Sequence, residues 1–137
     1  MTRETINPAE MYDAVSYGFS HAVAHEGRRV IECAGQVAWD DHGNLVGPGD
    51  FAAQTAQVFR NLRKVLAHCG AGPADVVRLR TFIVGHDADK LDVLTPALAA
   101  FYGPATPAAN TLIGVQSLAL PGILIEVDAT AVVGSGA

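Results

Sequence analysis

One carboxylate interrupts an apolar stretch near the end of the chain. Glu126 follows a Leu-Pro-Gly turn and stands among aliphatic residues, in the run Ile123-Leu-Ile-Glu-Val127. Alternation along a strand would aim Glu126 at one face of a sheet, together with Asp128. Burying an unpaired carboxylate is costly, so such a residue finds hydrogen-bond donors or takes part in chemistry. The alternative is a solvated face or sheet edge, where charged residues usually lie.

A second candidate for proton transfer is His21, because histidine titrates near neutral pH. The alternative for His21 is an exposed or hydrogen-bonded strand residue without a chemical role. The turn Asp40-Asp-His-Gly-Asn44 gathers oxygen ligands and one histidine. It lacks the ordered spacing of a calcium loop and a second histidine at metal spacing, so it predicts a plain turn. The sequence therefore predicts no metal and no cofactor.

Composition excludes several classes of protein. The chain has 137 residues, of which 50% are hydrophobic, which predicts a single domain over residues 1–137. Its net charge of -5 and scattered basic residues argue against a nucleic-acid-binding surface. No stretch approaches the roughly twenty apolar residues that a membrane helix needs. Two cysteines, Cys33 and Cys69, are too few and too differently placed for a disulfide framework, which favours the cytoplasm.

Apolar patterns predict the order of elements. Residues 15 to 24 and 28 to 38 are expected to form a hairpin around the turn at residues 25 to 27. A helix is predicted from the N-cap Asp50 to Gly70, and a second from Asp87 or Asp89 to Gly103. A strand from Val76 to Val84 lies between them. Strands over about 109 to 117 and 122 to 133 close the fold, and the tail 134–137 is expected to end outside it.

The resulting order, β-β-α-β-α-β-β, predicts an α+β fold in which two helices pack on one face of a mixed β-sheet. The opposite face would remain uncovered in a single copy. An uncovered apolar face aggregates, whereas a closed ring of identical subunits buries it. The pattern therefore favours a homo-oligomer.

Several motifs, in this order and spacing, resemble the RidA (YjgF/YER057c/UK114) family of small reactive-intermediate deaminases. The similarity covers nearly the whole chain. The matching stretches are Tyr17-Gly-Phe-Ser-His-Ala22, Cys33-Ala-Gly-Gln36, Gln54-Thr-Ala-Gln-Val-Phe-Arg-Asn-Leu62, Pro107-Ala-Ala-Asn110 and Leu120-Pro-Gly-Ile-Leu-Ile-Glu-Val-Asp-Ala129. The resemblance implies the chorismate-mutase-like RidA fold and a homotrimer with a ligand cleft at each subunit interface.

The resemblance also implies roles for particular residues. Glu126 alone keeps the family's residue type, as the catalytic acid. Asn110 falls where the family has the arginine that holds a substrate carboxylate, and it has neither the charge nor the fork of that group. Positions that line the family's cleft fall on Phe19 in place of tyrosine, on Ala34 in place of serine, on Gly35 and on Thr95. His21 stands where many relatives have glutamine.

The resemblance therefore predicts a hydrolase that converts a small imine or enamine to a carbonyl compound and ammonia. Glu126 would shuttle a proton, His21 would assist it, and Asn110 would hold the small-molecule substrate. Without the arginine, 2-aminoacrylate is a doubtful substrate. The alternative is a trimer of the same fold that binds a small metabolite without catalysis, because the arginine, tyrosine and serine are all replaced.

Overall fold

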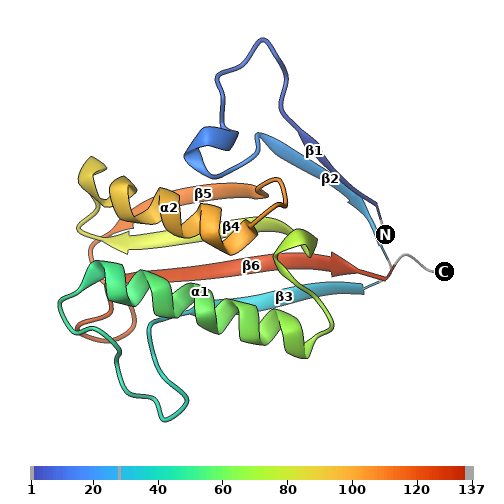
Figure 1. Ribbon diagram of the computed structural model, residues 1–137. Coiled ribbons are helices and arrows are strands. Elements are labelled where there is room, and N and C mark those ends of the chain that lie inside the picture. The colour runs from blue at the N-terminus through green and yellow to red at the C-terminus, as the bar shows by residue number, and fades with distance from the viewer. Residues whose placement is uncertain (1, 28, 135–137) are drawn as a thin grey trace.

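A computed structural model describes residues 2–27 and 29–134. The main layer is a four-stranded sheet in the order β3-β6-β4-β5, and both long helices pack on one of its faces (Figure 1). The fold is therefore α+β with a mixed sheet, as predicted. The elements are β1 (Thr2–Ile6), β2 (Ala22–Glu26), β3 (Arg29–Gln36), α1 (Phe51–His68), β4 (Val76–Val84), α2 (Leu91–Tyr102), β5 (Ala109–Val115) and β6 (Ile125–Val133).

Strand directions follow from the connections. β6 lies antiparallel between β3 and β4, whereas β5 pairs parallel to β4. A parallel neighbour needs a crossover, and α2 provides it between β4 and β5. β5 consequently forms the edge of the sheet next to α2.

The predicted hairpin between residues 15–24 and 28–38 is wrong. β2 starts only at Ala22 and pairs with β1, in a separate two-stranded sheet. Val15–Tyr17 form a 3-10 turn that ends at Gly18, whose φ of 91° favours glycine. β3 pairs with β6 instead, because its alternate residues Ile31 and Cys33 are buried under the helices there. The polar sequence of β1 carries no apolar alternation, so the sequence pattern does not predict this strand.

The core lies between the helices and the sheet. Alternate residues of β6 face it, and α1 contributes a buried stripe. The rings of Phe59 and Phe101 meet at a centroid distance of 5.1 Å and join α1 to α2. The fully buried residues with large side chains include Val58, Leu62, Leu66, Leu79, Ile83, Leu94, Leu98, Ile125 and Val127.

Helix ends agree closely with the sequence signals. The Asp50 side chain accepts a hydrogen bond from the backbone N–H of Ala53 at 3.0 Å, which confirms it as the N-cap of α1. α1 ends at His68, before Gly70 with its φ of 75°. α2 begins after a 3-10 turn at Ala88–Lys90, slightly later than predicted.

The Asp40 turn is held by its own side chain. Asp40 Oδ1 accepts hydrogen bonds from the backbone N–H groups of His42 and Asn44, both at 2.9 Å. The carboxylate closes the turn as an aspartate commonly does. Its oxygen is thus engaged by the backbone.

The described residues, 2–27 and 29–134, include no helix that is both long and apolar enough to cross a membrane. The predicted tail beyond Gly134 lies outside the described residues.

One buried amide joins three segments around the start of β6. Gln54, which is fully buried in α1, donates from Nε2 to the carbonyl oxygens of Gly47 at 3.1 Å and Gly122 at 2.9 Å. Its Oε1 accepts the backbone N–H of Leu124 at 2.9 Å. The Leu-Pro-Gly turn is therefore fixed to α1 directly before β6.

Replacing Gln54 with leucine is expected to lower the free energy of unfolding by about 3 kcal/mol, because buried backbone groups lose their partners. Gln116→Leu is the matched control, since Gln116 is exposed in a loop. Urea denaturation at one fixed protein concentration measures both. Equal shifts for the two variants would contradict the structural role of Gln54.

Candidate functional site

Glu126 lies on the face of the sheet that the helices leave uncovered. Its β6 neighbours Ile125 and Val127 are fully buried toward the helices, whereas Glu126 is half-buried on the opposite side. In the register, Glu126 stands beside Phe82 of β4. The strand alternation expected from the sequence is confirmed.

A β-bulge in β3 makes room for this carboxylate. Cys33 pairs with Ala129 and Gln36 with Val127, so Ala34 and Gly35 together oppose the single residue Asp128. A Cβ atom on Gly35 would lie 2.6 Å from Glu126 Cδ. Gly35 is therefore required for the close approach of the carboxyl group to the backbone, and the predicted residues Ala34, Gly35 and Glu126 lie together.

The two acids of β6 have different surroundings. Asp128 accepts two hydrogen bonds from Arg80, from Nε at 3.1 Å and from Nη2 at 2.7 Å. Among the described residues, Glu126 receives no such bond. Burial, and secondly the negative charge of Asp128, raise the pKa of the Glu126 carboxyl above its usual value. A carboxyl with a raised pKa can donate and accept a proton closer to neutral pH.

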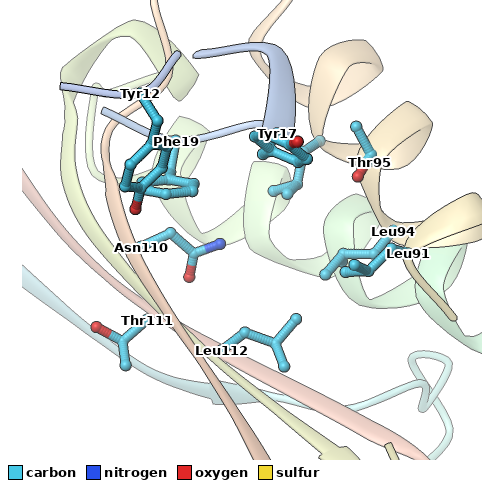
Figure 2. Close-up of a pocket in the computed structure, with 10 residues that line it drawn as sticks. Tyr12, Tyr17, Phe19, Leu91, Leu94, Thr95, Asn110, Thr111 and Leu112 are labelled. Atoms are coloured by element: carbon cyan, nitrogen blue, oxygen red, sulfur yellow. The ribbon is translucent and has the colours of Figure 1, made fainter. Parts of the chain in front are cut away.

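An apolar pocket of about 650 Å³ lies on the helix-facing side of the sheet, at the edge strand β5. It is enclosed by the N-terminal segment, α2 and β5 (Figure 2). It has the size of a typical small-molecule site. Its lining residues are Tyr12, Tyr17, Phe19, Leu91, Leu94, Thr95, Leu98, Asn110, Thr111 and Leu112. Three residues predicted from the sequence, Phe19, Thr95 and Asn110, thus lie together.

Asn110 is oriented by the strand beside it. Thr81, fully buried in β4, donates from Oγ1 to Asn110 Oδ1 at 3.1 Å. Figure 2 shows the amide nitrogen of Asn110 pointing into the space between Tyr17 and the leucines of α2. The side chain therefore presents N–H donors to the pocket.

Polar contacts hold the N-terminal segment against the pocket. Arg3 donates to the carbonyl oxygens of Val76 at 2.7 Å and Thr106 at 2.9 Å. The backbone N–H of Ser20 bonds to the carbonyl oxygen of Ala108 at 2.8 Å. These bonds fix both ends of the segment that carries Tyr12, Tyr17 and Phe19.

Sequence reasoning missed several of the lining residues. Tyr12 precedes any predicted element, and its ring packs edge-on against Phe19 at 6.3 Å. Leu91, Leu94 and Leu98 have the spacing of one helix face, a pattern that by itself indicates core packing. Leu94 and Leu98 are indeed buried, but Leu91 is 36% exposed at the mouth of the pocket.

His21 lies beside the pocket rather than next to Glu126. Its Nε2 is 2.9 Å from the carbonyl oxygen of Tyr12, and its ring meets the Tyr12 ring at 4.6 Å. It lines a separate, smaller cavity with Arg78 and Thr130. Within one chain the structure does not bring His21 to Glu126.

The predicted site residues therefore form two groups on opposite faces of the sheet. Asn110 pairs with Leu79 in the register and shares the helix-facing side with Thr81. Glu126 pairs with Phe82, which points the other way. A single chain cannot place Glu126 and Asn110 on one small molecule.

The sequence matches the protein family described as Endoribonuclease L-PSP over residues 11–133. The chain belongs to the Rid (YjgF/YER057c/UK114) family. This Rid protein is 53% identical to YyfB of Yersinia pestis, a conserved Rid family protein of unknown function. The match covers 97% of this chain and 100% of the other, with a TM-score of 0.94.

More distant relatives share the same scaffold. A YjgF/YER057c/UK114 family member from Mycobacterium tuberculosis is 28% identical, with a TM-score of 0.62, over 96% of this chain and 100% of that one. A RutC family protein of Pyrococcus abyssi is 28% identical over 74% of this chain and 76% of its own length. Family and fold are thus shown for this Rid protein.

The raised pKa of Glu126 predicts a pH-dependent effect of Glu126→Gln on the melting temperature. The folded protein binds the proton of the Glu126 carboxyl more tightly than the unfolded chain does. The contribution of Glu126 to the free energy of unfolding therefore falls as the pH rises from the pKa of the unfolded chain through the pKa of the folded protein. The ionised carboxylate is therefore destabilising at neutral pH. Glu126→Gln is expected to melt at a higher temperature than the wild type at pH 7.

The difference in melting temperature should vanish below about pH 4, where the wild-type carboxyl is also neutral. Glu32→Gln, an exposed change on the same sheet face, is the control. A lower melting temperature of Glu126→Gln than of the wild type at pH 7 would show that the ionised carboxylate stabilises the folded protein, which would contradict the prediction.

Proposed function

We propose that this Rid protein hydrolyses small imines or enamines to a carbonyl compound and ammonia. The reaction needs a bound C=N group, a water molecule and a residue that moves protons. Glu126 supplies the proton-moving carboxyl group, and the pocket at Asn110 supplies the binding surface. The conversion needs no metal ion or cofactor.

The observation that carries the proposal is the division of the site into two groups. Glu126 is open to a neighbouring molecule on the uncovered face, while the pocket opens at the edge strand β5. A second copy that covers the sheet face would bring its own pocket to Glu126. We therefore propose a homotrimer in which each cleft joins Glu126 of one copy to Asn110 of the next.

Exposed apolar side chains on the sheet face support such an assembly. Val30 is 55% exposed and Ile113 is 37% exposed, and both alternate with residues that face the helices. Burial of these side chains at a subunit interface would stabilise the ring. In a ring with closed symmetry, the sheet face of every subunit would be buried against a neighbour, so none would remain exposed.

In the cleft, the Glu126 carboxyl would protonate the substrate nitrogen, and its carboxylate would accept a proton from the attacking water. Water adds to the C=N carbon, the C–N bond then breaks, and ammonia leaves as the C=O bond forms. Gly35 keeps the carboxyl group close to the β3 backbone and so fixes its direction. Asn110 would hold the rest of the substrate through its amide N–H groups.

A second candidate is a trimer that binds a small metabolite without turnover. The observation in its favour is that the pocket wall is mostly apolar and offers few groups able to activate a substrate. Stabilisation by metabolites without any ammonia release would favour this candidate.

The family description also contains the word endoribonuclease. The net charge of -5 disfavours an RNA substrate, because phosphate binding relies on clustered positive charge.

We place the proposed reaction in the cytoplasm, since both Cys33 and Cys69 are free thiols.

The hydrolase proposal is tested by adding the purified protein to an amino-acid oxidase or amine oxidase that releases imines, with semicarbazide as the trap. The wild type is expected to lower the initial rate of semicarbazone formation, because hydrolysis removes the imine before the trap captures it. Glu126→Gln is expected to abolish this effect, and Gly35→Ala is expected to weaken it, because the new Cβ displaces the carboxyl group. Glu32→Gln, which leaves the bulge intact, should keep full activity. Unchanged turnover by Glu126→Gln would refute the mechanism.

The shared cleft is tested by mixing two defective subunits. Glu126→Gln and Asn110→Leu, each nearly inactive alone, are co-expressed with different tags and isolated as mixed assemblies. A cyclic trimer that contains both kinds has one intact cleft of three, so roughly a third of wild-type activity should return. Light scattering measures the molar mass of the wild type in solution, which is expected to be that of a trimer. No recovery of activity in the mixed assemblies would refute a cleft that joins Glu126 of one copy to Asn110 of the next.

A further inference from the structure

We infer that the pocket selects neutral imines with an aromatic or branched apolar group, in preference to imino acids that carry a carboxylate. This inference rests on the proposed function and names the class of substrate for the same site. The reaction is R–CH=NH + H2O giving R–CHO + NH3, in which the C=N bond breaks and water supplies the aldehyde oxygen.

The size of the pocket argues for a substrate larger than a three-carbon imino acid. A cavity of about 650 Å³ falls within the range that holds drug-sized ligands. Three aromatic side chains, Tyr12, Tyr17 and Phe19, form one side of it, and leucines of α2 face them (Figure 2). Aromatic rings that meet at an angle around such a space pack well against another ring or a branched chain.

The charge of the wall argues against a carboxylate. None of the described residues that line the pocket is basic or acidic. Transfer of a carboxylate into such surroundings without a positive partner costs free energy, because its hydration is lost. A small anion would therefore gain little binding free energy by entering the pocket.

Two guanidinium groups near β5 are held by other side chains. Arg78 donates at 3.3 Å to Oγ1 of Thr111, which is itself one of the lining residues. Arg80 is held by both oxygens of Asp128. Neither side chain lines the pocket.

The polar groups that do face the pocket suit an uncharged partner. Because Thr81 occupies Asn110 Oδ1, the amide nitrogen is the group left to face the ligand. It can donate to a carbonyl, ether or hydroxyl oxygen, but it adds no charge. Thr95 contributes a hydroxyl on the α2 side.

A neutral imine of this kind is the direct product of two-electron oxidation of a primary amine, so an amine-oxidising reaction is the class of step that would supply it.

The test compares two imines with the same ring. A flavin-dependent amine oxidase makes the neutral imine from 2-phenylethylamine, and an amino-acid oxidase makes the anionic one from phenylalanine. The fall in the initial rate of semicarbazone formation measures hydrolysis of each. We expect kcat/KM to be at least about tenfold higher for the neutral imine, as expected where a charge is buried without a partner.

Asn110→Arg, which adds a cation to the wall, is expected to shift this preference toward the phenylalanine-derived imine by at least about tenfold. Asn110→Gln is the matched control, because it keeps a neutral amide. Melting temperatures of both variants check that they are folded. An equal or greater kcat/KM of the wild type for the anionic imine would overturn the inference and leave the hydrolase proposal standing.

Binding without turnover separates the two proposals. Calorimetry with phenylacetamide and phenylacetate compares a neutral and an anionic ligand of the same shape. If neither imine is hydrolysed faster, the hydrolase proposal fails, and tighter binding of phenylacetamide still supports a pocket for neutral ligands. Equal or tighter binding of phenylacetate, or binding of neither, would overturn the inference.

Discussion

The buried amide of Gln54 is the interaction on which the site depends, because it fixes where β6 begins. Its hydrogen bonds tie α1 to Gly47 in the loop before the helix and to Gly122 and Leu124 in the turn before the strand. Residues of a strand alternate between faces, so a slip of one residue would turn Glu126 toward the helices and expose its apolar neighbours. A polar side chain inside the core thus determines which face carries the acid. The energetic reason is that buried backbone groups must keep partners, and Gln54 supplies three of them at once.

Two irregularities in the sheet create the two groups of site residues. In β3, the bulge at Ala34 and Gly35 removes a side chain and lets the Glu126 carboxyl approach the backbone. At the other edge, β5 pairs with β4 alone, so its second edge is left to the N-terminal segment and the pocket. The groups lie on opposite faces, and for this reason the fold of one chain separates what the proposed chemistry needs together. Assembly of copies would join them, so the proposed activity would depend on subunit association.

The residues of the pocket bear on the class of ligand that we propose. A neutral amide at Asn110, fixed by Thr81, keeps a directional hydrogen bond and gives up the charge that a carboxylate would need. Phe19, Tyr12 and the leucines of α2 add apolar surface to the same cavity. The combination favours ligands that bind by burial of apolar area, with one hydrogen bond to set their direction. In the proposed mechanism, proton transfer would fall to Glu126, whose raised pKa comes mainly from burial.

The sequence by itself determined the two helices, the N-cap at Asp50, the mixed sheet and the face of β6 that carries Glu126, because these follow from local periodicity and capping. It also placed Phe19, Thr95 and Asn110 in one site through resemblance to a family. It did not determine that β2 pairs with β1, because the polar stretch Thr2–Ile6 has no pattern of its own and becomes a strand through backbone pairing. Nor did it reveal Tyr12 as a pocket residue or separate Glu126 from Asn110. Those facts depend on which strands become neighbours and on which side each one faces, and such contacts between distant segments are set by tertiary packing rather than by local sequence.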